Sequence, residues 1–199
     1  YWGIRGLAQP IRNLLAYLNL AYEDKQYSDR DEWFTKDKPA LKTDFPNLPY
    51  LKDGDQVITE SEAIAVHLVL KANRGDLLGT TNEERVHIAQ LKGVLTDVRR
   101  DFYSVVANKA LTDLQKEFNE KVLPRLTLVS KHLGESEFLA GKVSILDFPF
   151  AEFLSSLLNQ DGDWLATLPN FKKYVERVNN LPGLKEYNAS GKASPLYNA

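Results

Sequence analysis

Residues 44–61 of the chain read DFPNLPYLKDGDQVITES and combine three local structural signals. Pro49 follows an apolar residue and leads into an extended run, the setting in which a cis X-Pro bond is kept at a strand edge. Asp53 and Gly54 predict a tight hairpin between two short strands. Ser61 precedes an apolar helical series and is predicted to be a helix N-cap whose free backbone N–H groups could hold an anion. An ordinary surface hairpin before a capped helix is the alternative, and this stretch alone does not exclude it.

The composition describes a chain with enough apolar residues for a sizeable core. Its 199 residues, 43% of them hydrophobic, suffice for one large or two small domains. The 25 Lys and Arg residues stand against 27 Asp and Glu, a net charge of -2 that argues against nucleic acid as a partner. No apolar run reaches membrane-spanning length. The absence of cysteine excludes a disulfide framework and a protein thiolate, and it favours a reducing, cytoplasmic location.

The N-terminal part alternates between extended and helical patterns. Residues 1–4 and 22–27 are typical of short strands, and their βαβ order implies parallel pairing. The helix between them is predicted from the spacing of Ile11, Leu14, Leu15 and Leu18, with Pro10 in its first turn. Pro39 limits any helix in residues 29–43 to short pieces. A chain that opens without an initiator Met is expected to be trimmed within its first strand.

After a polar, glycine-rich linker over residues 73–82, the pattern becomes helical. One apolar stripe predicts a long helix: Leu91, Leu95, Val98, Phe102 and Val105. A second stripe predicts another helix, which Pro124 is expected to kink: Leu114, Phe118, Val122, Leu126, Val129 and Leu133. Ser144 and Asp147 form a capping-box-like helix start. The sequence thus predicts an α/β domain at residues 1–73 and an all-helical domain at residues 83–199.

The chain resembles the cytosolic glutathione S-transferases and is most similar to their mu class. The resemblance covers nearly the whole chain and rests on YWGIRGLAQPIR at 1–12, DFPNLPYLKDG at 44–54, TESEAI at 59–64 and SILDF at 144–148. It implies a thioredoxin-like N-terminal domain, followed by an all-helical domain that contributes to the hydrophobic substrate site. The segment 22–33 is too short for the extra loop that mu-class proteins usually carry, so a sigma-like relative stays open.

The resemblance implies that the Tyr1 hydroxyl faces the sulfur of glutathione, the co-substrate. A free thiol has a pKa of about 8.5 and a phenol one of about 10, so at neutral pH the phenol is a donor and the thiol is mostly unreactive. A hydrogen bond to the thiolate lowers the thiol pKa. Because the chain has no cysteine, the nucleophile is the sulfur of the substrate. Without its sequence neighbours, Tyr1 would be interpreted as a core aromatic.

The same resemblance implies partners for the γ-glutamyl and cysteinyl parts of glutathione. The backbone of Leu48, fixed by Pro49, would pair with the cysteinyl part as an added strand does. Ser61 and the helix start would bind the γ-glutamyl carboxylate. Glu60 stands where the family commonly has Gln, and its carboxylate would pair with the ammonium.

The glycyl carboxylate is assigned to Lys38 with Asn47 nearby, although Lys38 could also belong to a solvated helix face. Family spacing favours Phe34 as the aromatic beside Lys38, whereas Trp33 is the chemical match. The apolar second substrate is expected to contact Trp2, Ile4, Leu7, Tyr103, Ala107 and Tyr197, of which Trp2 and Leu7 also belong to the glutathione set. Tyr103 and Tyr197 could equally be packing residues. No metal is predicted, because the histidines stand singly: His67, His87 and His132.

The resemblance also implies a twofold-symmetric homodimer. Asp97 would reach the γ-glutamyl ammonium in the other subunit's site, although alone it reads as an exposed helix charge. Phe45 would insert into a pocket of the other subunit. The implied activity is detoxifying conjugation of glutathione to hydrophobic electrophiles. A glutathione-dependent isomerase of the prostaglandin type and a non-catalytic ligand-binding relative are the alternatives.

Overall fold

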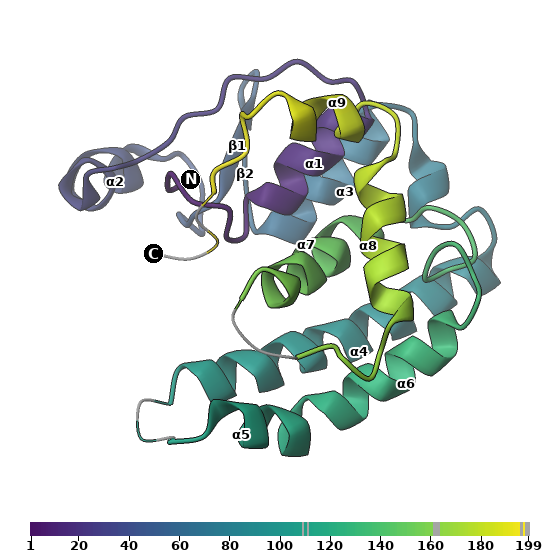
Figure 1. The fold of residues 1–199 in the computed structure, drawn as a ribbon. Helices are drawn as coiled ribbons and strands as arrows, with labels where there is room; N and C mark the ends of the chain where they lie inside the picture. The colour runs from purple at the N-terminus through teal and green to yellow at the C-terminus, as the bar shows by residue number, and fades with distance from the viewer. Residues whose placement is uncertain (109, 111, 161–163, 196, 198–199) are drawn as a thin grey trace. The chain divides into compact units, whose positions relative to one another are not determined.

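The computed structural model describes residues 1–108, 110, 112–160, 164–195 and 197. The chain divides into two compact units, one formed by Tyr1–Gly75 with Asn180–Ala199 and the other by Asp76–Asn179. The elements, labelled as in Figure 1, are α1 (Gln9–Tyr17), η1 (Glu32–Asp37), α2 (Lys38–Ala40), β1 (Tyr50–Asp53), β2 (Gln56–Thr59), α3 (Ser61–Lys71), η2 (Gly75–Leu78), α4 (Asn82–Val106), α5 (Leu114–Lys121), α6 (Leu123–Leu133), α7 (Asp147–Leu158), α8 (Asn170–Asn179) and α9 (Leu184–Ala189).

The predicted hairpin is confirmed, with its turn one residue later than expected. β1 pairs antiparallel with β2, in a register that runs from Tyr50 opposite Thr59 to Asp53 opposite Gln56. The two loop residues are therefore Gly54 and Asp55 rather than Asp53 and Gly54. Gly54 has a φ of 58°, which glycine adopts without steric cost.

The prediction of regular strands at residues 1–4 and 22–27 is wrong. In the described chain these segments meet at one isolated parallel bridge, between Trp2 and Tyr27. Their backbones are joined by Tyr27 N–H to Tyr1 O (2.8 Å) and Gly3 N–H to Tyr27 O (3.3 Å). The parallel direction is as expected. Residues 21–26 are all exposed, so this segment has no buried face that would fix a longer ladder.

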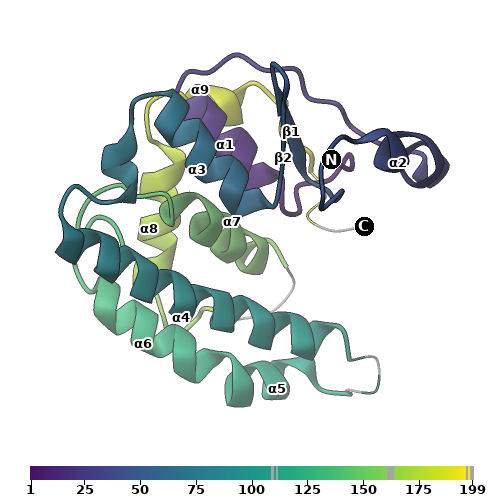
Figure 2. The same ribbon diagram turned by 180° about the vertical axis from the view of Figure 1, so that it is seen from behind.

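Helix α1 is the centre of the first unit and packs against α3 and α9, as both ribbon views show (Figures 1 and 2). Ile11, Leu14 and Leu15 are buried as predicted and Pro10 lies in the first turn, whereas Leu18 is the half-buried C-cap residue just after the helix. Gly183, with a φ of 77°, allows the entry to α9 to approach the end of α1 closely. A Cβ at Gly183 would lie 2.3 Å from the Ala16 carbonyl oxygen.

The second unit is built on α4, whose predicted stripe is buried from Leu91 to Val105. Pro124 does not kink a continuous helix, because it lies in the first turn of α6, where its missing N–H costs nothing, and α5 ends before it. Leu114 is 39% exposed, unlike the rest of its predicted stripe. Within the described residues, none of the helices has the length and apolar character required to cross a bilayer.

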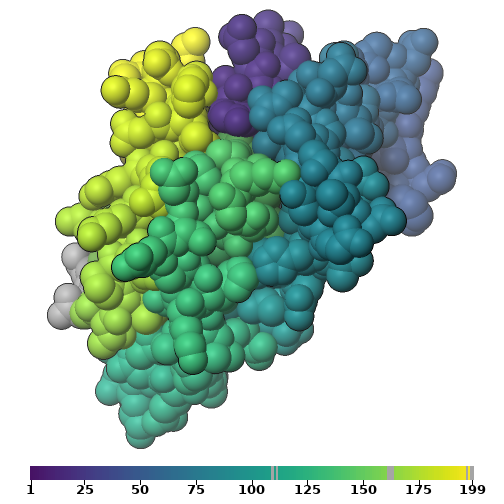
Figure 3. Space-filling model, turned by 90° about the vertical axis from the view of Figure 1, so that its right-hand side faces the viewer, coloured from purple at the N-terminus to yellow at the C-terminus, as the bar shows by residue number. Residues whose placement is uncertain are grey.

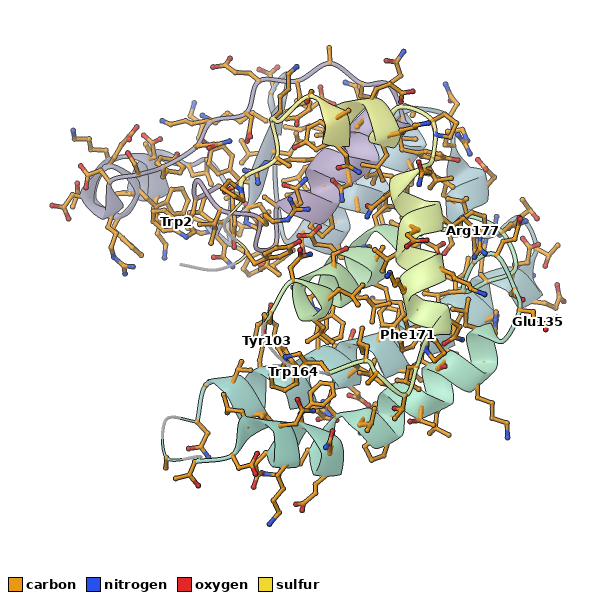
Figure 4. All side chains as sticks on the ribbon, viewed as in Figure 1. Trp2, Tyr103, Glu135, Trp164, Phe171 and Arg177 are labelled. Atoms are coloured by element: carbon orange, nitrogen blue, oxygen red, sulfur yellow. The ribbon has the colours of Figure 1, made fainter. Side chains whose placement is uncertain are left out.

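Aromatic rings fill the core of the second unit. Phe118 and Trp164 meet edge to face with ring centroids 4.8 Å apart, and Phe150 meets Phe171 at 5.5 Å (Figure 4). At the surface, α8 (yellow-green in Figure 3) lies beside the green segment that follows α6, and the Arg177 guanidinium donates to Glu137 O at 2.8 Å.

The predicted contact between Ser144 and Asp147 is present, but Ser144 is not the N-cap of α7, because the helix begins at Asp147 and its N-cap is Leu146. The Asp147 carboxylate accepts the Ser144 backbone N–H (2.7 Å) and hydroxyl (2.9 Å), the Leu139 N–H (3.3 Å) and the Tyr174 hydroxyl (2.7 Å). Burial raises the pKa of Asp147, while the four hydrogen bonds oppose this shift by favouring the charged form. The network joins α7, α8 and the segment before α7.

Candidate active site

The oxygen of the Tyr1 hydroxyl accepts one hydrogen bond from the protein backbone. The Leu7 backbone N–H donates to the Tyr1 oxygen at 3.2 Å. The hydroxyl hydrogen remains as a donor for a further acceptor. Because hydrogen bonds in a chain polarise one another, the accepted N–H makes the phenol a stronger donor. This arrangement suits a group that presents an O–H to an anion.

Gly6 makes room for the ring of Tyr1. Its φ is 40°, in the region that favours glycine, and a Cβ at this position would lie 2.7 Å from Tyr1 Oη and 2.8 Å from Tyr1 Cε1. A side chain at position 6 would therefore displace the phenol. The sequence analysis gave Gly6 no role in the site. The sequence feature that could have indicated its role is the position of this glycine in a turn, between a predicted strand and a predicted helix.

The C-terminal segment of the first unit fastens the loop that follows Tyr1. Gly6 N–H donates to Tyr197 O at 3.0 Å, and the Ser194 hydroxyl donates to Gly3 O at 3.1 Å. The Arg5 guanidinium donates to Ser194 O at 3.2 Å and lies 4.8 Å from the centre of the Tyr197 ring. Tyr197, predicted as a substrate contact, is thus also a packing residue of this loop.

The turn before β1 lies against the start of α3. The Leu48–Pro49 peptide bond is cis, as predicted. The Asn47 side chain bridges two parts of this turn, because its amide donates to Glu60 Oε1 at 3.2 Å while its oxygen accepts the Leu48 N–H at 2.9 Å. The predicted glutathione residues of this turn are therefore neighbours.

Glu60 occupies the N-cap position of α3 with an unusual backbone. Its φ of 67° and ψ of 117° lie outside the regions that a residue with a side chain ordinarily adopts, which costs about 1–3 kcal/mol. The prediction that Ser61 is the N-cap is wrong: Ser61 is the first helical residue, and no side chain caps α3. The reason is that the chain turns into the helix at Glu60. The Glu60 side chain therefore does not cap the first turn of α3.

The segment that carries Trp33, Phe34 and Lys38 includes the π-helix η1, in which hydrogen bonds run from residue i to i+5. The Lys38 N–H accordingly donates to Trp33 O. Trp33 is 3% exposed and stacks on Tyr50 with ring centroids 5.9 Å apart. Phe34 is 45% exposed, and its ring centre lies 5.7 Å from Lys38 Nζ. The wider turn places the Trp33 backbone one turn before Lys38, but the Trp33 ring is buried in the core and the exposed ring beside Lys38 is that of Phe34.

The apolar residues near Tyr1 form a partly exposed surface. Trp2 and Ile4 are half-buried, and Leu7 is 36% exposed. Trp2 lies 6.3 Å from Phe34 and 6.0 Å from Tyr27, measured between ring centroids. The structure thus brings Trp2, predicted as a contact of both substrates, beside one of the candidate aromatics.

The site residues predicted in the second unit lie on α4 and at its end. Tyr103 is 44% exposed (Figure 4), and Ala107 is exposed at the C-cap. Asp97 forms ion pairs within its own chain, with Arg100 at 2.8 Å and Arg125 at 3.4 Å.

A cavity of about 420 Å³ in the first unit does not coincide with the predicted glutathione residues. It lies among α1, α3, β1 and residues 20–25, and Tyr1 and Pro49 are the predicted site residues in its lining. No group of three or more His, Cys, Asp or Glu side chains suited to a metal occurs in the described part of the chain.

The histidines are less isolated than the sequence suggested. His67 is hydrogen-bonded to Asp53 at 2.8 Å. The rings of His87 and His132, on α4 and α6, lie 5.2 Å apart between centroids. His87 and His132, which are far apart in the sequence, thus lie close together within the second unit.

Comparison with known proteins gives the family. The model "Glutathione S-transferase, N-terminal domain" matches residues 1–69, and "Glutathione S-transferase, C-terminal domain" matches residues 96–191. The chain is 36% identical to the class-mu 26 kDa isozyme 51 glutathione S-transferase of Fasciola hepatica over 195 residues, which cover 96% of this chain and 88% of that protein. This chain belongs to the glutathione S-transferase family, and its curated relatives include mu-class members such as glutathione S-transferase Mu 2 of Rattus norvegicus, which is 36% identical over 99% of this chain and 93% of that protein.

Solved structures agree with this assignment. The crystal structure of the glutathione S-transferase Blo t 8 matches with a TM-score of 0.86 and 29% identity, covering all of this chain and 95% of the other. Prostaglandin synthase D of Nilaparvata lugens matches with a TM-score of 0.78 and 26% identity, covering 98% and 97%. The predicted fold class is confirmed: a thioredoxin-like N-terminal domain with a small sheet, followed by a helical domain.

Proposed function

We propose that the chain is a glutathione transferase in which the Tyr1 hydroxyl stabilises the thiolate of glutathione, the thiol proton leaves to solvent, and the sulfur is transferred to a hydrophobic electrophile. The observation that carries the proposal is the Tyr1 hydroxyl, which accepts Leu7 N–H and keeps its own hydrogen as a donor. A bound thiolate beside this donor gains a charge-assisted hydrogen bond that the neutral thiol cannot match. The sulfur then attacks the electrophilic carbon and the leaving group departs with its electron pair.

The γ-glutamyl end is assigned to the turn between β2 and α3. Its carboxylate meets the Ser61 hydroxyl and the first N–H groups of α3, where the helix dipole favours an anion. Its ammonium meets the Glu60 carboxylate, which Asn47 holds at 3.2 Å. The strained backbone of Glu60 supports a binding role, because such strain is concentrated at functional sites.

The cysteinyl part is assigned to the backbone of Leu48, next to Pro49. Pairing with its N–H requires this group to leave the Asn47 side chain, to which it donates at 2.9 Å. The exchange replaces one hydrogen bond by another, so its net cost is small. Binding is therefore expected to reorient Asn47.

The glycyl carboxylate is assigned to Lys38. Within the described residues, Lys38 forms no ion pair, so its charge is available to a ligand. Both aromatics stay candidates for its partner: Trp33 has an indole N–H donor and lies one π-helical turn before Lys38, but its side chain is buried. Phe34 has no donor and offers only its exposed ring face.

The second substrate is expected to be apolar. We assign its contacts to Trp2, Ile4, Leu7 and Tyr197, while Tyr103 and Ala107, which are also predicted from the sequence, lie in the other unit and stay predictions. The exposure of Leu7 supports this assignment. The cellular role that follows is detoxification in the cytoplasm.

We also propose a homodimer. Phe45 is 74% exposed, an unusual position for an aromatic ring unless another surface covers it. Burying one such anchor contributes about 2 kcal/mol or more to association, and twofold symmetry counts it twice. Asp97 is assigned to the γ-glutamyl ammonium in the other subunit, so its ion pairs with Arg100 and Arg125 would hold the carboxylate in place.

Sedimentation velocity of the parent and of Phe45→Ala tests the dimer. We expect the parent to be dimeric at micromolar concentration and the variant to dissociate. A monomeric parent that is fully active would remove the roles given to Phe45 and Asp97.

Turnover of a chlorinated nitroaromatic with glutathione, run beside a prostaglandin isomerisation, tests the function. The similarity to prostaglandin synthase D of Nilaparvata lugens makes isomerisation the second candidate. Conjugation at the higher rate supports our proposal, and isomerisation at the higher rate supports the second candidate. A protein without either activity that still binds apolar ligands would be a non-catalytic relative.

A further inference from the structure

A polar network joins the end of η1 to the segment beside Tyr1. Asp37, the last residue of η1, accepts hydrogen bonds from Lys25 Nζ and from the Tyr27 hydroxyl, both at 2.5 Å. Lys25 also pairs with Glu32, the first residue of η1, at 3.1 Å. Both ends of the π-helix are therefore tied to the same short segment of chain.

The Tyr27 hydroxyl extends this network to β1. Its oxygen lies 3.0 Å from the Tyr50 hydroxyl. Because the Tyr27 hydrogen goes to the Asp37 carboxylate, Tyr50 is the donor in the second bond. The rings of Tyr27 and Tyr50 also hold Trp33 between them, at 5.5 and 5.9 Å between centroids. One carboxylate thus orders the rings that enclose Trp33.

The same segment holds Tyr1. Tyr27 N–H donates to Tyr1 O at 2.8 Å, and Tyr27 O accepts Gly3 N–H at 3.3 Å. Tyr27 is 2% exposed, so it is a fixed point between Tyr1 and η1. Lys25 and the Tyr27 hydroxyl also lower the pKa of Asp37, which keeps it an acceptor at neutral pH.

We propose that Asp37 is a positioning residue for the glycyl end of glutathione: by binding Lys25 and Tyr27 it fixes η1, and with it Trp33 and Lys38, at a set distance from Tyr1. The inference rests on the proposed function. Asp37 itself does not touch glutathione in this account. Its loss should therefore weaken recognition of the glycyl carboxylate and leave thiol activation intact.

The test compares glutathione with γ-glutamylcysteine, which lacks only the glycyl residue. Binding of both ligands is measured by calorimetry for the parent, Asp37→Asn and Tyr27→Phe. Asp37→Asn removes the charge that holds Lys25, and Tyr27→Phe removes one hydroxyl while keeping the buried ring. Asp55→Asn, the same change in the exposed hairpin loop, is the matched control.

We expect the parent to bind glutathione more tightly than γ-glutamylcysteine. Asp37→Asn should weaken glutathione binding about five- to tenfold, the range for coupled neighbouring groups, with γ-glutamylcysteine binding and the bound thiol pKa unchanged. Tyr27→Phe should show the same selectivity with a smaller loss, and Asp55→Asn none.

Equal losses for both ligands would overturn the inference, because Asp37 would then support the fold in general. Unchanged binding of both ligands in Asp37→Asn would overturn it as well. A parent that binds the two ligands equally would contradict a glycyl site and leave conjugation intact. A parent that binds neither ligand would overturn the proposed function together with the inference.

Discussion

The two units of the molecule use their polar side chains differently. In the second unit, Asp147 is completely buried, and its carboxylate accepts four hydrogen bonds, from Ser144 twice and from Leu139 and Tyr174. In the first unit, Tyr1 accepts one N–H and keeps its own hydrogen. The Asp147 network is saturated and stabilises the fold, whereas Tyr1 retains capacity for a ligand.

Backbone strain differs between the units as well. Among the described residues that carry a side chain, positive φ occurs at Asn19, Glu60 and Asn73, all in the first unit, whereas in the second unit it occurs at glycines. The long helix α4 has a regular buried stripe and carries Gly93 without any close contact at its Cβ position. Substitutions in the first unit should therefore change chemistry more than stability, and those in the second should do the reverse.

Asp147→Ala should give the largest loss of stability. It leaves the donors at Ser144, Leu139 and Tyr174 without their acceptor, so we expect the free energy of unfolding to fall by about 3 kcal/mol. Urea denaturation followed by circular dichroism measures this. Asp113→Ala is the control, because it removes an exposed N-cap hydrogen bond to Lys116 N–H and should cost only about 1 kcal/mol. If both variants lost the same free energy of unfolding, the buried Asp147 network would contribute no more to stability than the exposed hydrogen bond of Asp113.

Gly6→Ala and Gly93→Ala should change stability in opposite directions, and only Gly6→Ala should reduce turnover. The Gly6 variant pushes on the Tyr1 ring, so we expect turnover to fall about tenfold and stability by about 1 kcal/mol. The Gly93 variant should gain about 0.5 to 1 kcal/mol through helix propensity, with turnover unchanged. Steady-state kinetics and urea denaturation of both variants measure these effects. Full turnover in Gly6→Ala would show that the phenol position is not critical.

Glu60→Gln and Ser61→Ala should affect binding alone, without loss of stability. An amide oxygen at position 60 can still accept from the ligand ammonium, so we expect a loss of about two- to threefold. Loss of the Ser61 hydroxyl removes a hydrogen bond to a carboxylate and should weaken binding about tenfold. Calorimetric titration with glutathione decides between them, and a larger loss for Glu60→Gln would contradict the assignment of both ends.

Sequence predicted the features that short-range chemistry determines. The stripe of α4 follows from helical periodicity, and the cis bond before Pro49 follows from its neighbours. The contact between Ser144 and Asp147 follows from their spacing of three residues. The family motifs added the candidate residues around Tyr1.

Features that depend on distant contacts were not predictable in this way. Family spacing and side-chain chemistry pointed to different aromatics at Trp33 and Phe34, and the π-helical turn that carries both is not visible in a hydrophobic pattern. The hydrogen bonds of Asp37 with Lys25 and Tyr27 form only in the folded chain, because these residues are 12 and 10 positions away in the sequence. Likewise, nothing in the sequence around Tyr197 indicates that its carbonyl accepts the Gly6 N–H.

The most direct test of the account is the titration of the bound glutathione thiol in the parent and in Tyr1→Phe, followed by thiolate absorbance. Tyr17→Phe is the control, since the Tyr17 hydroxyl accepts from Arg74 elsewhere in the first unit. We predict that the thiol pKa in the parent and the control lies one unit or more below the free value of about 8.5, and that Tyr1→Phe returns it toward that value with little change in affinity. A thiol that titrates identically in Tyr1→Phe and the parent would contradict the role of Tyr1.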